Sequence, residues 1–300
     1  MHLTREPVLR SIAAGAAIGV VLALAGCAVP RPPGDEPLRY RDAVFSNVDV
    51  SRDLTYGSAP DLEGDPVALK LDLYEPTGDT VSRRPAVVYV HGGGFSAGDK
   101  SAGADFATYF AKRGYVATSI NYRLLAPSGC GGASAPSPEC VSAALAAQHD
   151  AQAAVRWLRA NASTHRVDPD RIAMAGSSAG AITSLLAAWR SDDPGSSGNP
   201  GHPSAIDGAV SISGGTPSNA FINGGDAPAI FFHGTADGTV PYAWAVSNAG
   251  AMVSAGIATY LESFEGGGHG LVQAGNRDVI YEQADYFMYT FMDLGNAEGG

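Results

Sequence analysis

Short apolar runs of strand length alternate along this chain with longer segments whose apolar residues recur at helical spacing. The run PAVVYV at residues 85–90 is apolar throughout, which is typical of a central parallel strand buried on both faces. Residues 141–162 instead place Ala151, Val155 and Leu158 on one face of a helix. This alternation constrains the fold most strongly, because it predicts a mostly parallel sheet with helices on both faces.

The same patterns recur to the end of the chain. We expect strands at residues 67–76, 85–90, 115–124, 171–175, 207–213, 228–234 and 258–266, and helices at 104–114, 141–162, 179–190, 242–256 and 278–292. With 300 residues, of which 45% are hydrophobic, the chain can form one large α/β domain without a large separate lid. Chemistry in such sheets is expected at the carboxyl ends of the strands.

The first residues have the composition of an export signal. Two arginines precede an apolar stretch at residues 11–25 that is short for a membrane span. The stretch ends in LAGC, which resembles the lipobox of bacterial lipoproteins, and this resemblance implies lipidation of Cys27. We therefore expect a signal peptide at 1–26, a lipidated cysteine and Pro-rich spacer at 27–39, and a folded domain at 40–295. The alternative is ordinary cleavage and secretion as a soluble protein.

The expected location is the cell envelope, with the lipid on Cys27 as the membrane contact. The formal net charge of −11 disfavours a nucleic acid partner and electrostatic attraction to an anionic membrane. In an oxidising compartment we expect a disulfide between Cys130 and Cys140, the alternative being two free thiols. Neither cysteine has neighbours typical of a metal site.

The sequence AGSSAGA lies between the strand predicted at 171–175 and the following helix. A G-x-S-x-G nucleophile elbow requires this strand-to-helix context. Centring the pattern on Ser178 puts Gly176 and Gly180 at the flanking positions, whereas centring it on Ser177 puts alanines there. Because the chain packs tightly at both positions, we predict Ser178 as the nucleophile.

The sequence HGGGF, residues 91–95, follows the strand predicted at 85–90. A glycine turn at this position can direct backbone N–H groups at a developing oxyanion. The alternatives are a plain glycine turn or a dinucleotide-binding fingerprint. The fingerprint requires an acidic residue at the end of the next strand, and residues 115–124 contain none, so we set it aside.

A carboxylate and a histidine follow the last two predicted strands. Asp237 lies in the loop after residues 228–234, and His269 lies in the glycine-rich GGGHGL loop. A triad needs a carboxylate to orient its imidazole base. Asp237 also suits an ordinary Asp-Gly turn. His91 and His233 sit at strand ends and are interpreted as structural.

Oxyanion loop, serine, aspartate and histidine occur in the chain order of one fold. Together with NYRL, VDPDRIAMAGSSAG and HGTADGTVP, they resemble the α/β-hydrolase superfamily and its H-G-G-G carboxylesterases and lipases. The resemblance implies an α/β-hydrolase fold, with the N–H groups of Gly93, Gly94 and Ala179 as oxyanion donors and no metal or organic cofactor. Ser177 and Ala181 depart from the G-D-S-A-G-G pattern of many hormone-sensitive-lipase relatives, which leaves the subfamily open.

The expected activity is serine ester hydrolysis through Ser178, His269 and Asp237. Three loops at about 126–139, 191–203 and 214–225, rich in Gly, Ser and Pro, are long enough to shape the site, and they favour esters with short or medium acyl groups. Two alternatives remain: a peptidase or polyester hydrolase with the same triad, and a catalytically silent binding lipoprotein.

Overall fold

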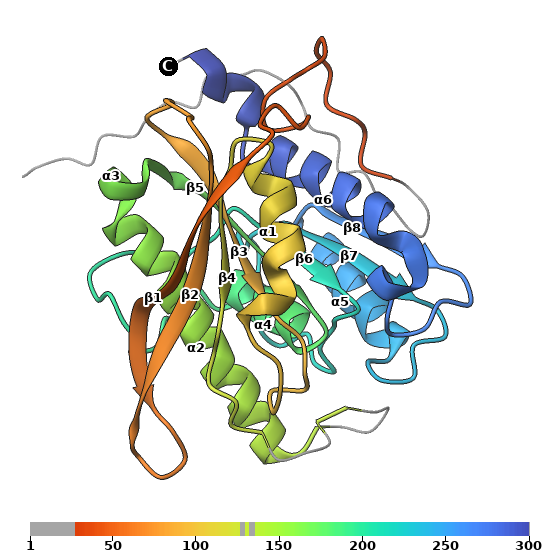
Figure 1. The fold of residues 1–300 in the computed structure, drawn as a ribbon. Coiled ribbons are helices and arrows are strands. Elements are labelled where there is room, and N and C mark those ends of the chain that lie inside the picture. Colours follow the sequence, from red (N-terminus) through yellow and green to blue (C-terminus); the bar gives the residue numbers. More distant parts are fainter. Residues whose placement is uncertain (1–27, 127–129, 132–135, 300) are drawn as a thin grey trace, which may run out of the picture.

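The computed structural model describes residues 28–126, 130–131 and 136–299, and these residues form one eight-stranded sheet (Figure 1). The strands are β1 (Val48–Pro60), β2 (Pro66–Pro76), β3 (Arg84–Val90), β4 (Val116–Ile120), β5 (Val167–Ser177), β6 (Gly208–Ile212), β7 (Ala229–Gly234) and β8 (Thr259–Phe264). Their order across the sheet is β1-β2-β4-β3-β5-β6-β7-β8. Strand β2 runs antiparallel to both its neighbours, and the strands from β4 to β8 are parallel.

The helices are α1 (Ala104–Ala111), α2 (Pro138–Ala160), the short α3 (Ala162–His165), α4 (Ala179–Trp189), α5 (Tyr242–Ser254) and α6 (Arg277–Phe291). Helices α1 and α6 cover one face of the sheet, and α2, α4 and α5 cover the other (Figure 1). Shorter turns lie at η1 (Lys100–Gly103), η2 (Val272–Asn276) and η3 (Leu294–Gly299). The predicted fold class, a mostly parallel sheet between two helical layers, is confirmed.

Strand β3 shows why its sequence is apolar at every position. Ala86, Val88 and Val90 belong to the core beneath α2, α4 and α5, whereas Val87 and Tyr89 belong to the core beneath α1 and α6. Successive side chains of a strand point to opposite faces, so a strand covered on both faces has no polar side. Because β3 lies between β4 and β5, its end and the glycine loop after it lie in the middle of the sheet.

Strand β1 was not predicted. It lies at the edge of the sheet, most of its side chains are exposed, and its pairing with β2 shifts register between Ser51 and Leu54 and again between Thr55 and Gly57. An edge strand with one neighbour does not need the apolar alternation that identifies an inner strand.

Strand β4 is shorter than the predicted segment 115–124 and ends at Ile120. The N–H of Asn121 still donates to the Lys70 carbonyl of β2 at 2.8 Å, and polar side chains hold the residues that follow. Arg123 pairs with the buried Asp150 of α2 at 2.8 Å, and the Asn121 side-chain oxygen accepts the N–H of Lys100 at 2.7 Å. At these contacts the chain leaves the sheet, and the loop that carries Cys130 follows.

The segment before β1 packs on the domain. Val29 is buried, and its N–H donates to the Gln283 side-chain oxygen of α6 at 2.5 Å. Tyr40 is also buried, and its N–H donates to the Arg113 carbonyl at 2.8 Å. We expected an extended spacer at 27–39, but the apolar side chain of Val29 brings this segment onto α6. The signal peptide and Cys27 lie outside the described residues.

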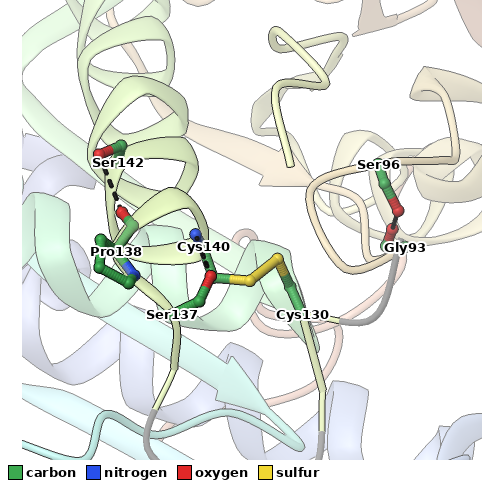
Figure 2. The surroundings of a disulfide bond; sticks show 7 residues. All are labelled: Gly93, Ser96, Cys130, Ser137, Pro138, Cys140 and Ser142. Atoms are coloured by element: carbon green, nitrogen blue, oxygen red, sulfur yellow. Dashed lines mark hydrogen bonds between the residues drawn. A yellow bond between two sulfur atoms is a disulfide. The ribbon is translucent and has the colours of Figure 1, made fainter. Parts of the chain in front are cut away.

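Cys130 and Cys140 form the predicted disulfide (Figure 2). The bond ties the loop after β4 to the first turn of α2, where the Ser137 hydroxyl accepts the N–H of Cys140 at 3.3 Å and caps the helix. In the part of the chain that the structure describes, no helix is long and apolar enough to cross a membrane.

Candidate active site

Ser178 lies at the sharp turn between β5 and α4, with φ of 55° and ψ of −118°. A positive φ is unfavourable for a residue with a side chain, so the turn must be held by its surroundings. A Cβ on Gly176 would lie 2.3 Å from the Gly180 carbonyl, and one on Gly180 would lie 2.0 Å from the Val90 carbonyl oxygen. The turn therefore has room only for glycine at both positions flanking Ser178.

Three side chains from separate loops meet at the carboxyl edge of the sheet. The Nε2 atom of His269 lies 2.8 Å from Ser178 Oγ, and its Nδ1 atom lies 2.8 Å from Asp237 Oδ2. With the ring proton on Nδ1, His269 donates to the carboxylate and accepts from the serine hydroxyl. The structure thus brings together the three residues that the sequence predicts as a triad.

Asp237 is held in place by its own turn. Its Oδ1 atom accepts the N–H groups of Thr239 at 2.8 Å and Val240 at 3.0 Å, which leaves Oδ2 for His269. The Asp237 side chain is 0% exposed and that of His269 is 27% exposed. A buried carboxylate that keeps one oxygen for the imidazole is suited to orient it and to stabilise its protonated form.

His233 lies on the other side of Asp237. Its Nε2 atom is 2.9 Å from the Val240 carbonyl oxygen and 3.3 Å from Asp237 Oδ2. Burial lowers the pKa of His233, so the ring is neutral near pH 7 and donates to Val240 through Nε2–H. It therefore packs against the carboxylate without adding a charge.

Ser213 was not predicted as part of the site. It is the fully buried residue after β6, it has φ of 55°, and its hydroxyl donates to the backbone carbonyl of His269 at 2.8 Å. No local pattern identifies it, because the contact joins residues 56 positions apart in the chain.

The glycines after β3 form a tight loop beside Ser178. A Cβ on Gly92 would lie 3.2 Å from the Ser178 Cβ, and one on Gly93 would lie 2.1 Å from the Ala97 carbonyl oxygen. Gly93 and Gly94 have φ of 117° and 61°, which a residue with a side chain rarely adopts.

Within the described part of the chain, no backbone hydrogen bond outside helices and strands uses the N–H of Gly93 or Gly94. Ala179 is the first residue of α4, so the helix supplies no partner for its N–H. Among the described residues, these three N–H groups thus have no backbone partner, and the N-terminus of α4 favours negative charge near Ser178.

A cavity of about 500 Å³ adjoins the elbow. Ile182, one helical turn after Ser178 and hydrogen-bonded to it through its N–H at 3.0 Å, lines the cavity, as does Phe95 after the glycine loop. Most of the lining is apolar or small, and it comprises Phe95, Cys130, Gly131, Pro136, Ser137, Cys140, Val141, Ala144, Leu145, Ile182, Leu186, Gly215, Thr216, Pro217, Ser218, Phe221, Thr239, Val240 and Trp244.

Comparison with solved structures decides the fold family. Esterase 2 of Thermogutta terrifontis superposes with a TM-score of 0.65 and 28% identity, over 84% of this chain and 97% of the esterase. The chain has the α/β-hydrolase fold. A form of the same esterase with bound propionate matches equally well, with a TM-score of 0.65 and 28% identity over 84% of this chain and 97% of that one.

Sequence comparison finds similarity to esterases. The family model described as BD-FAE matches residues 71–214. The probable carboxylic ester hydrolase LipM of Mycobacterium tuberculosis is 30% identical over 57% of this chain and 35% of its own length. The carboxylesterase NlhH of the same species is 38% identical over 37% of this chain and 31% of its own. The chain thus matches about a third of the length of these curated relatives.

Proposed function

We propose that this chain is a serine carboxylic ester hydrolase that acts on esters with short or medium acyl groups. The observation that carries the proposal is the continuous chain of contacts from Ser178 Oγ through His269 to Asp237, each 2.8 Å long. Ser178 attacks the ester carbonyl while His269 Nε2 takes its proton, and Asp237 stabilises the imidazolium that forms.

The oxyanion formed by this attack needs hydrogen-bond donors. The N–H groups of Gly93, Gly94 and Ala179 supply them in the proposed reaction, since backbone donors on a rigid turn need no reorganisation as the charge develops. His269 then returns its proton to the alcohol oxygen as the C–O bond breaks. Water, activated by the same imidazole, hydrolyses the acyl-enzyme and restores Ser178.

The position of the cavity indicates where the acyl group and the alcohol group of the ester would bind. The alcohol leaves next to His269, which protonates it, and none of the cavity-lining residues comes from the loop that carries His269. Its lining instead includes Phe95, which directly follows Gly94, and Ile182, one helical turn after Ser178. We therefore assign the cavity to the acyl group, whose apolar surface its lining would cover.

The similar proteins support the same activity. LipM and NlhH are named as a probable carboxylic ester hydrolase and a carboxylesterase, and the Thermogutta terrifontis esterase has been solved with propionate and with butyrate bound. Both bound molecules are short carboxylates, the acid products that the proposed reaction releases from short acyl esters.

The test is hydrolysis of p-nitrophenyl esters from acetate to palmitate by the full-length chain and its Ser178→Ala variant. We expect turnover on acetate to octanoate, and a loss of about 10⁴-fold or more in Ser178→Ala. The matched control is Ser177→Ala, which removes the neighbouring hydroxyl and should stay within about tenfold of the unaltered chain. Loss in Ser177→Ala instead would make Ser177 the nucleophile, and no turnover together with no fluorophosphonate labelling would favour a binding protein.

For location, we propose a lipid anchor on Cys27 in the cell envelope. The support is the sequence around Cys27, an apolar stretch that ends in LAGC. Metabolic labelling with a radioactive fatty acid in a bacterial host should mark the full-length chain and not its Cys27→Ala variant. Equal release of both proteins into the soluble fraction would contradict the anchor.

A further inference from the structure

The Cys130–Cys140 disulfide forms part of the cavity surface. Six lining residues belong to the segment that this bond closes or to the helical turn that holds it: Cys130, Gly131, Pro136, Ser137, Cys140 and Val141. We call these six residues the disulfide wall. Figure 2 shows the bond crossing from the loop to the start of α2, in the same view as the Gly93 loop.

The disulfide wall reaches across to the loop that holds Asp237. A Cβ on Gly131 would lie 3.3 Å from the Cγ2 atom of Thr239, so the backbone of Gly131 packs on that side chain. Thr239 is itself fixed by its N–H, which donates to Asp237 at 2.8 Å. The wall therefore spans the cavity from α2 to the residues beside Asp237.

The same loop is joined to the proposed oxyanion loop before it reaches the disulfide. The N–H of Ala126 donates to the Phe95 carbonyl oxygen at 3.1 Å, and Phe95 directly follows Gly94 and lines the cavity. The loop after β4 is thus attached near Phe95 at one end and to α2 at the other. The covalent bond to Cys140 holds Cys130, and Gly131 next to it, beside the first turn of α2.

We propose that the Cys130–Cys140 disulfide determines the acyl-chain selectivity of this site. It holds the disulfide wall against the far part of a medium-length acyl chain, so that the chain is covered on binding. An acetyl group stays beside Ser178 and does not reach the wall. The inference rests on the proposed function and names the substrate feature that the wall recognises, an acyl chain of about six to ten carbons.

Opening the disulfide should therefore affect long and short substrates differently. Each methylene buried on binding is worth about fourfold in affinity, so loss of cover over two methylenes would lower the affinity about fifteenfold. A substrate that does not reach the wall should be unaffected, because the contacts among Ser178, His269 and Asp237 do not involve either cysteine.

The experiment compares kcat/KM for p-nitrophenyl acetate and p-nitrophenyl octanoate. It uses the full-length chain, a Cys130→Ser/Cys140→Ser double variant, and the full-length chain reduced with tris(2-carboxyethyl)phosphine. The phosphine-treated double variant controls for other effects of the reductant. The Ser142→Ala variant controls for the loss of a side chain near the start of α2 while the disulfide stays in place. Ser142 is exposed and does not line the cavity.

We expect kcat/KM for octanoate to fall about fifteenfold through a higher KM, with acetate within about twofold, in both the double variant and the reduced chain. The Ser142→Ala variant should match the unaltered chain. Unchanged octanoate kinetics, or an equal fall for both esters, would overturn the proposal. In each sample, acetate hydrolysis shows that the triad is intact. A lack of acetate hydrolysis by the oxidised, unaltered chain would contradict the proposed esterase function and not the role of the disulfide.

Discussion

The Ser213 hydroxyl donates a hydrogen bond of 2.8 Å to the backbone carbonyl oxygen of His269. Ser213 is fixed at the end of β6 by its own N–H, which donates to the Phe232 carbonyl at 2.8 Å. His269 lies in a loop with glycine at 266, 267, 268 and 270, where the backbone has unusual freedom. The bond therefore ties the glycine-rich loop of the site to the sheet.

Replacing Ser213 with alanine should lower kcat about tenfold and change KM by less than about twofold. The backbone at Ser213 stays the same while the tie to His269 is lost, and a base displaced by a fraction of an ångström transfers its proton less well. Steady-state kinetics on p-nitrophenyl butyrate and the rate of fluorophosphonate labelling measure the effect.

The matched control is Ser211→Ala in the same strand. Ser211 is also fully buried, and in the described structure its hydroxyl has no hydrogen-bond partner. This variant should keep its kcat. Equal losses in both variants would mean that the strand needs its serines for packing, not for placing His269.

Replacing Asp237 with asparagine should lower kcat by about 10³-fold to 10⁴-fold while the protein stays folded. The amide oxygen can still accept the N–H groups of Thr239 and Val240, but the amide NH₂ would face His269 Nδ1 and favour the wrong tautomer. Kinetics and a thermal melt of the same samples separate the two effects. A kcat within tenfold of the unaltered enzyme would show that Asp237 does not orient the base.

Two glycine-to-alanine changes should alter stability in opposite directions. In Gly180→Ala the new Cβ would lie 2.0 Å from the Val90 carbonyl oxygen, so we expect destabilisation by at least about 3 kcal/mol. Gly250 is exposed within α5, and nothing lies within 4 Å of its added Cβ. Gly250→Ala should stabilise by about 0.5–1 kcal/mol. Urea denaturation measures both, and a neutral Gly180→Ala would contradict the tight packing of the elbow.

Stability should fall as the pH drops below about 6.5, the ordinary pKa of histidine in an unfolded chain. Burial lowers the pKa of His91, whose ring stacks on Tyr122 at 4.4 Å between centroids. Below pH 6.5 the unfolded chain binds a proton that native His91 does not, so the free energy of unfolding decreases with falling pH, by up to about 1.4 kcal/mol per unit. The decrease from this residue ends once the pH passes its lowered native pKa.

The His91→Gln variant should show a smaller loss of stability between pH 7.5 and pH 5.5 in urea titrations. His233, whose pKa burial also lowers, contributes a loss of the same sign that the variant retains. The exposed His202 offers a matched His202→Gln variant that controls for the substitution itself. Identical slopes in His91→Gln and the unaltered chain would contradict the prediction.

Local chemistry explains which parts of the molecule could be predicted. The inner strands were identified because burial on both faces demands apolar residues at every position, as β3 shows with Val87 and Val88 in opposite cores. Edge strand β1 was not identified, because an exposed strand does not require apolar residues at every position. The packing of Val29 on α6 was not predicted either, because no local pattern in a proline-rich segment identifies the surface on which it packs.

The sequence by itself determined the order of strands β2 to β8 and of the five long helices, the Cys130–Cys140 pairing and the candidates Ser178, Asp237 and His269. Each of these follows from short-range patterns of apolar residues, glycines and cysteines. Only the tertiary structure decided that Ser213 holds His269 and that the disulfide lines the cavity beside Ile182. Such contacts join segments far apart in the chain, and their geometry arises only when the parallel strands bring their carboxyl ends to one edge of the sheet.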